Sequence, residues 1–136
     1  MELTDTTRWI RDAMPLCATL GIEAEEATAD FVVLSLDWAP QLCTGGGLLH
    51  GGVLMALADS AGGACAFLNL PAGAGTSTIE SGTHFLGRVT EGRVTARARP
   101  LHVGRTTVVV ETEVHGANGR LVAKVTQTQA VLAPSH

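Results

Sequence analysis

Apolar residues recur at helical spacing in two segments of the chain. Residues 5–20 show this spacing, with Asp5 or Thr6 available as the N-cap, and Pro15 is expected to shorten or kink the helix. Residues 51–68 contain no proline and repeat the helical pattern. The expected core stripe of this second helix consists of Val53, Leu54, Leu57, Ala58, Ala61, Cys65 and Leu68. The pattern therefore predicts a short N-terminal helix and one long central helix.

The remaining segments favour extended strands. Two short strands are expected within residues 21–38, joined near residues 28–30. Four more are expected after the central helix, because VVVETEVH alternates with period two and glycines mark the turns. Their approximate bounds are 76–87, 92–102, 105–115 and 120–132. Consecutive strands pair antiparallel, so we expect an α+β fold in which a curved antiparallel sheet wraps around the central helix.

Composition excludes several classes of function. A chain of 136 residues fits one domain, so residues 1–136 are assigned to a single domain. The net charge of −4 argues against a nucleic-acid partner, which normally requires a basic face. No apolar run approaches the roughly 20 residues that span a membrane, and no signal-peptide pattern opens the chain. The three cysteines form no CxxC or Cys/His cluster. We therefore expect a cytoplasmic protein with no metal site.

One carboxylate stands out in the central segment LLHGGVLMALADSAGG. Asp59 is the only charged residue from Trp38 through Ile79, apart from any proton on His50. Its predicted helix face is otherwise nearly bare of side chains and carries Gly52, Met55, Ala56, Gly62, Gly63 and Ala66. Such a face admits a partner backbone or a slim ligand. The carboxylate itself has two interpretations: a tertiary ion pair, or a general base or nucleophile in a largely apolar pocket.

The start of the central helix offers a second chemical feature. The first N–H groups of a helix have no internal partner and carry the positive end of the helix dipole. Glycine at Gly51 and Gly52 lets a ligand oxygen approach those groups, so this end of the helix can stabilise an oxyanion. For His50 two interpretations stay open: contact with a ligand, or a structural cap that braces the loop.

Distance along the helix separates these two features. Gly51 and Asp59 are eight residues apart, which corresponds to roughly 12 Å along a helix axis at 1.5 Å per residue. Both groups cannot easily reach one carbonyl carbon within one chain. If they act on one substrate, two antiparallel helices must each supply one group. The spacing therefore predicts a composite site at a dimer interface.

The motif HGGVLMALADSA (residues 50–61), followed by the strand pattern of residues 76–128, resembles the hot-dog fold acyl-CoA thioesterases. The likeness covers about residues 20–132 and is nearest the branch of phenylacetate-pathway and 4-hydroxybenzoyl-CoA enzymes. It implies that the Gly51 N–H polarises the thioester carbonyl and that Asp59 of the other subunit is the base or nucleophile. It further implies that His50 supports the loop and that Ser77 supplies a hydroxyl to water or to the carboxylate. Ser77 is equally well interpreted as an ordinary strand-start residue.

Departures from the family pattern bear on substrate binding. Relatives often carry Asn or Gln six residues before the signature His, where this chain has Thr44, and Gln41 is a candidate substitute. Some relatives carry Thr one turn after the acidic residue, where this chain has Gly63. By this resemblance the expected substrate-binding residues are Gly52, Thr44, Gln41 and Gly63.

The resemblance implies hydrolysis of a small or medium acyl- or aryl-CoA thioester, with coenzyme A as part of the substrate and no cofactor. It also implies a homodimer at minimum, with a homotetramer expected. The chain has no Tyr and few aromatic residues, which predicts an aliphatic pocket wall. Two alternatives stay open. One is a non-catalytic acyl-CoA-binding or sensing module, and the other is a hot-dog enoyl-thioester hydratase that pairs an acid with a histidine such as His84 or His102.

Overall fold

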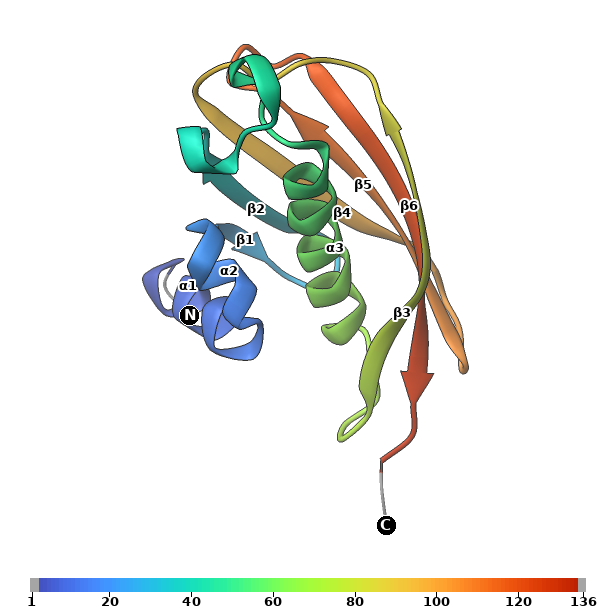
Figure 1. Cartoon of the computed structure of the whole chain (residues 1–136). Coiled ribbons are helices and arrows are strands. Elements are labelled where there is room, and N and C mark those ends of the chain that lie inside the picture. Colours follow the sequence, from blue (N-terminus) through green and yellow to red (C-terminus); the bar gives the residue numbers. More distant parts are fainter. Residues whose placement is uncertain (1–2, 135–136) are drawn as a thin grey trace.

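Six antiparallel strands form one curved sheet in the order β1-β2-β4-β5-β6-β3 (Figure 1). The computed structural model describes residues 3–134. The strands are β1 (Glu23–Ala27), β2 (Val32–Asp37), β3 (Gly75–Phe85), β4 (Arg93–Val103), β5 (Thr107–His115) and β6 (Leu121–Leu132). Each begins and ends within about three residues of the expected bounds. The predicted antiparallel sheet is confirmed.

The long helix α3 (Gly51–Phe67) lies along the concave side of the sheet and packs against β2 to β6 (Figure 1). Its leucines, alanines and Cys65 meet inward-facing valines and leucines of the strands to form the core. The expected stripe is buried except at Val53 and Leu68, which are partly buried. Strand β5 alternates between buried and partly buried residues along its whole length, as the period-two pattern predicts.

The N-terminal helical segment is divided at its proline. Helix α1 (Leu3–Ala13) ends before Met14, and helix α2 (Pro15–Leu20) begins with Pro15. Proline lacks an N–H and fits the first position of a helix, so it starts a new helix where it would break a continuous one. The break places α1 beside β1 and leaves its inner face against α3.

Strand β3 is one edge of the sheet and carries a β-bulge. Its pairing with β6 shifts register between Thr78 and Glu80, so Ile79 has no opposite residue. Beyond the bulge the alternation of side chains changes phase. As a result Thr78 faces the same side of β3 as Ser81, Thr83 and Phe85, the side that α3 covers.

Within residues 3–134, no helix is both long enough and apolar enough to cross a membrane.

Candidate functional site

Asp59 lies midway along α3, on the side facing β3. Its Oδ1 accepts hydrogen bonds from the Thr78 hydroxyl at 2.8 Å and from the Gln127 side-chain amide at 3.0 Å. No described residue donates to its Oδ2. The side chain is exposed in the single chain, and no described Lys, Arg or His forms an ion pair with it. The ion-pair interpretation is therefore wrong within one chain. One carboxylate oxygen, Oδ1, is fixed by two hydrogen bonds, and the other, Oδ2, accepts none from the described residues.

A cavity of about 270 Å³ opens beside Asp59. One wall is the inner face of α1, the floor is α3, and the far side is the start of β3. Trp9 and Phe67 both line it, with ring centroids 5.8 Å apart and ring planes at 47°. The expected aliphatic wall is wrong in this respect, because two of the five aromatic residues of the chain line this cavity. Gly63 also lines this cavity.

The loop before α3 sets the position of His50. Gly46 and Gly47 have φ of +76° and +73°, conformations that glycine adopts without strain. The Trp38 indole N–H donates to the Gly47 carbonyl at 3.0 Å and pins the loop. His50 is then the N-cap of α3, and its Nδ1 accepts the Gly52 N–H at 2.8 Å. The capping interpretation of His50 is confirmed. Since Nδ1 is the acceptor, neutral His50 carries its proton on Nε2.

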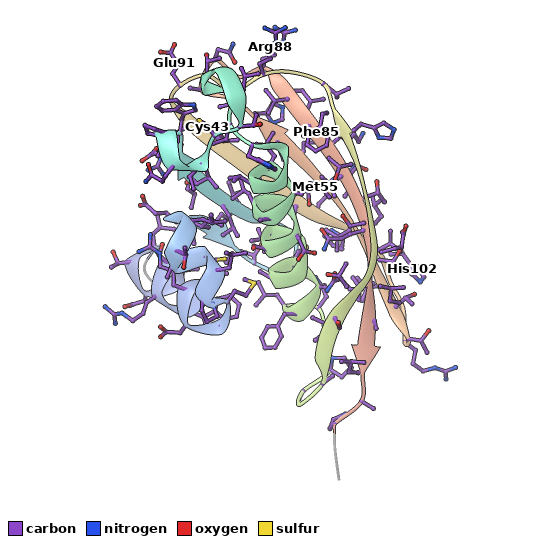
Figure 2. The ribbon with its side chains drawn as sticks, viewed as in Figure 1. Cys43, Met55, Phe85, Arg88, Glu91 and His102 are labelled. Carbon is purple, nitrogen blue, oxygen red and sulfur yellow. The ribbon has the colours of Figure 1, made fainter. Side chains whose placement is uncertain are left out.

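Because His50 accepts the Gly52 N–H, the Gly51 N–H is the backbone donor that remains available in the first turn of α3. The Gly52 N–H is engaged by His50, whereas the Gly51 N–H has no partner among the described residues. The Phe85 ring lies beside Gly51, so close that a Cβ at residue 51 would be 3.1 Å from the ring. Figure 2 shows Phe85 and Met55 on the side of α3 that faces β3. Glycine therefore keeps the first turn accessible between the loop and the ring.

The His50 end of the helix borders a separate cavity of about 430 Å³. Gln41, His50 and Gly52 line it, together with apolar residues of α2 and α3. Thr44 is exposed and does not line it; its N–H closes the glycine loop by donating to Leu48 O at 2.8 Å. Of the two candidates for the missing amide, Gln41 is the one that reaches this half of the site. Asp59 does not line this cavity, which agrees with the separation expected along the helix.

The side-chain hydroxyl that donates a hydrogen bond to Asp59 belongs to Thr78. An unbroken alternation back from Phe85 would put Ser77 on the inner side of β3. The bulge at Ile79 shifts the phase by one residue, so Thr78 pairs with Gln129 on the inner side and Ser77 pairs with Ala130. Ser77 is exposed and lines the Asp59 cavity but makes no hydrogen bond to Asp59.

The bare face expected around Asp59 is only partly open. Met55 and Gly52 are exposed, but Gly62 and Ala66 are buried against the chain's own sheet. A Cβ at Gly62 would overlap the Gln127 side-chain amide. Gly62 is thus explained by close packing inside one chain, without a partner or ligand.

The buried cysteines are not candidates for the chemistry. Burial raises the pKa of the Cys65 thiol to about 11, and burial also raises the pKa of Cys17. Both thiols therefore stay protonated near neutral pH. Within residues 3–134, no group of three His, Cys, Asp or Glu side chains is arranged to hold a metal ion.

Comparison with known proteins decides the family. The family model described as "Thioesterase superfamily" matches residues 46–123, which include Gly51 and Asp59. ComA2 of Bacillus subtilis, whose name includes the word esterase, is 35% identical over 119 residues, covering 86% of this chain and 94% of its own. The chain belongs to the thioesterase superfamily.

Solved thioesterase structures share the whole architecture. Thioesterase HI1161 of Haemophilus influenzae matches with a TM-score of 0.91 at 25% identity, covering 100% of this chain and 94% of its own. A variant of thioesterase PA1618 of Pseudomonas aeruginosa matches with a TM-score of 0.86 at 28% identity, covering 93% of each chain. The predicted hot-dog fold and the assignment as a thioester hydrolase are confirmed.

Thioester hydrolysis needs a donor for the carbonyl oxygen and a group that activates the nucleophile. Along α3 the described residues leave one donor, the Gly51 N–H, and one acceptor, the Asp59 Oδ2, without a hydrogen-bond partner. The sequence-based reasoning missed Thr78, Gln127 and Gln129, which surround Asp59. A signal for the two glutamines was present, because period two in LVAKVTQTQAVL places them on the same face as Val125, at positions that normally hold apolar residues.

Proposed function

We propose that this thioesterase hydrolyses acyl-CoA thioesters at a site shared between two subunits. Asp59 of one subunit activates the nucleophile, and the Gly51 N–H of the other holds the carbonyl oxygen. The supporting observation is that Asp59 lines one cavity while His50 and Gly52, the neighbours of Gly51, line another, with Gly51 and Asp59 eight residues apart on one helix. Neither half alone provides both functions that the reaction requires.

The exposed edge of β3 supports the pairing of two subunits. Eleven residues of β3 have no strand on their outer side within the described chain. Apolar side chains are exposed along this edge and the adjoining helix face, including Ile79 at 60% and Phe85 at 51%. A long, exposed edge strand with unpaired N–H and C=O groups invites pairing with another strand. A second copy of β3 would extend the sheet and cover these side chains.

The β-bulge and the helix together set the expected register between β3 of one subunit and β3 of the other. Thr78 contacts Asp59, and Phe85 lies beside Gly51. Asp59 of one copy approaches Gly51 of the other if Thr78 lies opposite Phe85 in an antiparallel pair. With Ile79 bulged out of each strand, the two-fold axis then passes through Gly82, which lies opposite its own copy. Opposite residues of a pair face the same side, and Thr78 and Phe85 do face the side covered by α3.

The reaction follows from these groups. Water adds to the thioester carbonyl carbon while Asp59 accepts its proton, and the Gly51 N–H stabilises the negative charge on the carbonyl oxygen. The carbon–sulfur bond then breaks, and the leaving thiolate recovers the proton from Asp59. The products are a carboxylic acid and free coenzyme A. Direct attack by Asp59 on the carbonyl carbon uses the same two groups.

The cavity beside Asp59 supports a small or medium acyl group. A volume of about 270 Å³ with two aromatic rings in its wall accommodates an aryl group or a short aliphatic chain. The hydratase alternative lacks a histidine in this cavity: neither His84 nor His102 lines it, and Figure 2 shows His102 on the opposite side of the sheet from α3.

The test is release of free thiol from short, medium, long and aryl acyl-CoA substrates. The wild-type protein should release thiol from at least one of them, and Asp59→Asn should bind that substrate while its kcat falls at least 100-fold. Wild-type kcat in Asp59→Asn would exclude Asp59 as the catalytic group. Saturable binding without thiol release would instead indicate the sensing module, and an enoyl chromophore without free thiol would indicate the hydratase.

A further inference from the structure

Two glutamines lie under Asp59 in the core of the fold. Gln127 is fully buried and Gln129 is 2% exposed, both on the face of β6 that α3 covers. Uncharged amides at core positions lose their hydration and are retained only where hydrogen bonds replace it. The proposed reaction does not by itself require them.

The donor and the acceptor of each hydrogen bond in this group are fixed by its neighbours. The Ala130 backbone carbonyl can only accept, so the Thr76 hydroxyl donates to it at 2.8 Å. Thr76 Oγ1 must therefore accept from the Gln129 Nε2, which lies 3.1 Å away. This turns Gln129 Oε1 toward Gln127, whose Nε2 donates to it at 2.9 Å. The second N–H of that Nε2 points to Asp59 Oδ1. A backbone carbonyl thus sets the orientation of every amide up to the carboxylate.

Thr78 completes the arrangement at Asp59. Its hydroxyl has one hydrogen and lies near two acceptors, Asp59 Oδ1 at 2.8 Å and Gln129 Oε1 at 2.5 Å. A carboxylate oxygen is a stronger acceptor than an amide oxygen, so the Thr78 hydrogen is directed to Asp59. Oδ1 thereby receives two donors while Oδ2 receives none from the described residues.

Gln127 adopts this orientation at a cost to stability. Its Oε1 is buried and has no hydrogen-bond partner among the described residues. Turning the amide over would place Oε1 against two acceptors, Asp59 Oδ1 and Gln129 Oε1, so the unpartnered orientation is the one available. An unsatisfied buried acceptor destabilises the folded state. Gly62 accommodates this oxygen, because any Cβ there would overlap it.

We propose that Gln127, held by Gln129 and Thr76, is a positioning residue that fixes the Asp59 carboxylate with Oδ2 directed to the substrate. The inference rests on the proposed function of Asp59 and goes beyond it by assigning a role to the core behind the site. Gln127 acts through Asp59 and does not touch the reacting atoms. It raises the rate of the chemical step and lowers the stability of the fold.

Activity and stability should therefore respond in opposite directions to Gln127→Met. Methionine has a similar size and shape, does not donate to Asp59, and removes the unpartnered Gln127 Oε1. The Thr78 hydroxyl also lies within hydrogen-bond distance of Gln129 Oε1 and can donate to it in place of Gln127. We expect kcat to fall about 10- to 100-fold, because a loosely held catalytic group loses that much through misplacement. KM should change less than about threefold, and the melting temperature should stay level or rise.

The matched control removes a buried hydroxyl elsewhere in the sheet. Thr112 on β5 is fully buried, its hydroxyl has no partner among the described residues, and it lies outside both cavities. Thr112→Val should leave kcat unchanged and keep or raise the melting temperature. Equal losses of kcat in Thr112→Val and Gln127→Met would show that any change in the sheet impairs the enzyme and would overturn the proposal.

A second pair of variants tests how the hydrogen bonds orient the two glutamines, without replacing either glutamine. Thr76→Val keeps the shape of residue 76 but removes the hydroxyl that orients Gln129, so kcat should fall severalfold. Thr76→Ser keeps the hydroxyl and should restore most of the lost rate. If Thr76→Val and Thr76→Ser have the same kcat, the hydroxyl does not act through the chain and the proposal fails.

The Asp59→Asn variant distinguishes a failure of the proposed function from a failure of the positioning role of Gln127. Wild-type kcat in Asp59→Asn overturns the proposed function itself. Loss of activity in Asp59→Asn together with wild-type kcat in Gln127→Met overturns only the positioning role. A lower melting temperature in Gln127→Met with unchanged kcat would assign the glutamine to folding alone.

Discussion

The ring of Phe85, at the end of β3, lies against Gly51, the first residue of α3, and would be 3.1 Å from a Cβ there. The pair brings the exposed sheet edge to the helix terminus that carries the open N–H. Any substituent at residue 51 must displace the ring. Two substitutions at residue 51 can separate the effect of removing the N–H on activity from the effect of adding a side chain.

Gly51→Pro removes the N–H and should lower kcat about 100- to 1,000-fold, the usual loss for one oxyanion donor. Proline suits the first helical position, and His50 already has the extended conformation (ψ 133°) that a following proline requires. Gly51→Ala adds a Cβ but keeps the N–H, so it should be clearly more active. Steady-state thiol release measures both. Equal losses would show that space beside Phe85, and not the N–H, matters at this position.

Mixing two inactive variants tests whether the site is shared. Asp59→Asn and Gly51→Pro each impair a different half, so a mixed dimer has one intact site and one site with both defects. Random exchange of subunits makes half of the dimers mixed and should restore about a quarter of the wild-type activity. The measurement is thiol release after unfolding and refolding the mixture, with each variant refolded alone as the control. No gain over those controls would place both groups in one subunit's site.

Enlarging the acyl cavity should change substrate preference. Trp9→Ala removes an aromatic wall beside Asp59 without touching the catalytic groups. The ratio of kcat/KM for longer over shorter acyl-CoA substrates should rise about tenfold, since space in an apolar pocket discriminates by roughly that amount. Both substrates are measured on the same preparation, so any loss of folded protein cancels in the ratio. An unchanged ratio would mean that the acyl group lies elsewhere.

The cysteines should differ in their reaction with a thiol reagent. Cys17 and Cys65 are buried, and burial raises the pKa of both thiols, to about 11 for Cys65. Cys43 is only partly buried in the loop before α3 (Figure 2). Ellman's reagent should therefore label Cys43 in the native protein and all three cysteines after denaturation. Cys43→Ser should abolish native labelling; rapid labelling that persists in this variant would contradict the burial of the other two.

The ion pairs of Glu111 with Lys124 and Arg99 should make the stability of the fold depend on pH in the acid range. Glu111 lies 2.9 Å from Lys124 and 3.4 Å from Arg99, and its hydrogen bond to Lys124 holds its pKa below the ordinary value of 4.5. The folded state thus binds this proton less readily than the unfolded chain. The resulting stabilisation is present above about pH 4.5 and is lost as the pH falls through the lowered pKa.

Glu111→Gln should accordingly reduce the melting temperature at pH 7 and bring it closer to the wild-type value at pH 3. Thermal unfolding at the two pH values measures the difference. Glu91→Gln serves as a control, because Glu91 is exposed and forms no ion pair among the described residues (Figure 2). A destabilisation by Glu111→Gln that is the same at both pH values would rule out the ionic contribution.

The fold was largely predictable because its signals are local. Pro15 divides the N-terminal segment, the alternation of β5 marks its inward face, and the proline-free stretch from Gly51 forms one helix. The separation of Gly51 and Asp59 along one helix followed from helix geometry alone. These features depend on spacing within one element, which a sequence displays directly.

The environment of Asp59 depends on contacts between distant segments and was predicted only in part. The shift at Ile79 arises from pairing with β6, and alternation within β3 does not reveal it. The burial of Gly62 likewise depends on Gln127, 65 positions further along the chain. The aromatic wall arises because α1 folds back over α3 and brings Trp9 to Phe67. Each requires knowledge of which segments meet.

The unpaired residue at Ile79 also bears on how relatives of this chain should be aligned. Deleting Ile79 would remove the bulge and leave Thr78 opposite Gln129, on the inner side of β3. The same hydroxyl would then still reach the acidic residue of the helix, now six residues before Phe85 instead of seven. An insertion or deletion at the bulge therefore changes the spacing along β3 but keeps this contact. Two homologous sequences can keep the same contact while their hydroxyl residues occupy different columns of an alignment that places no gap here.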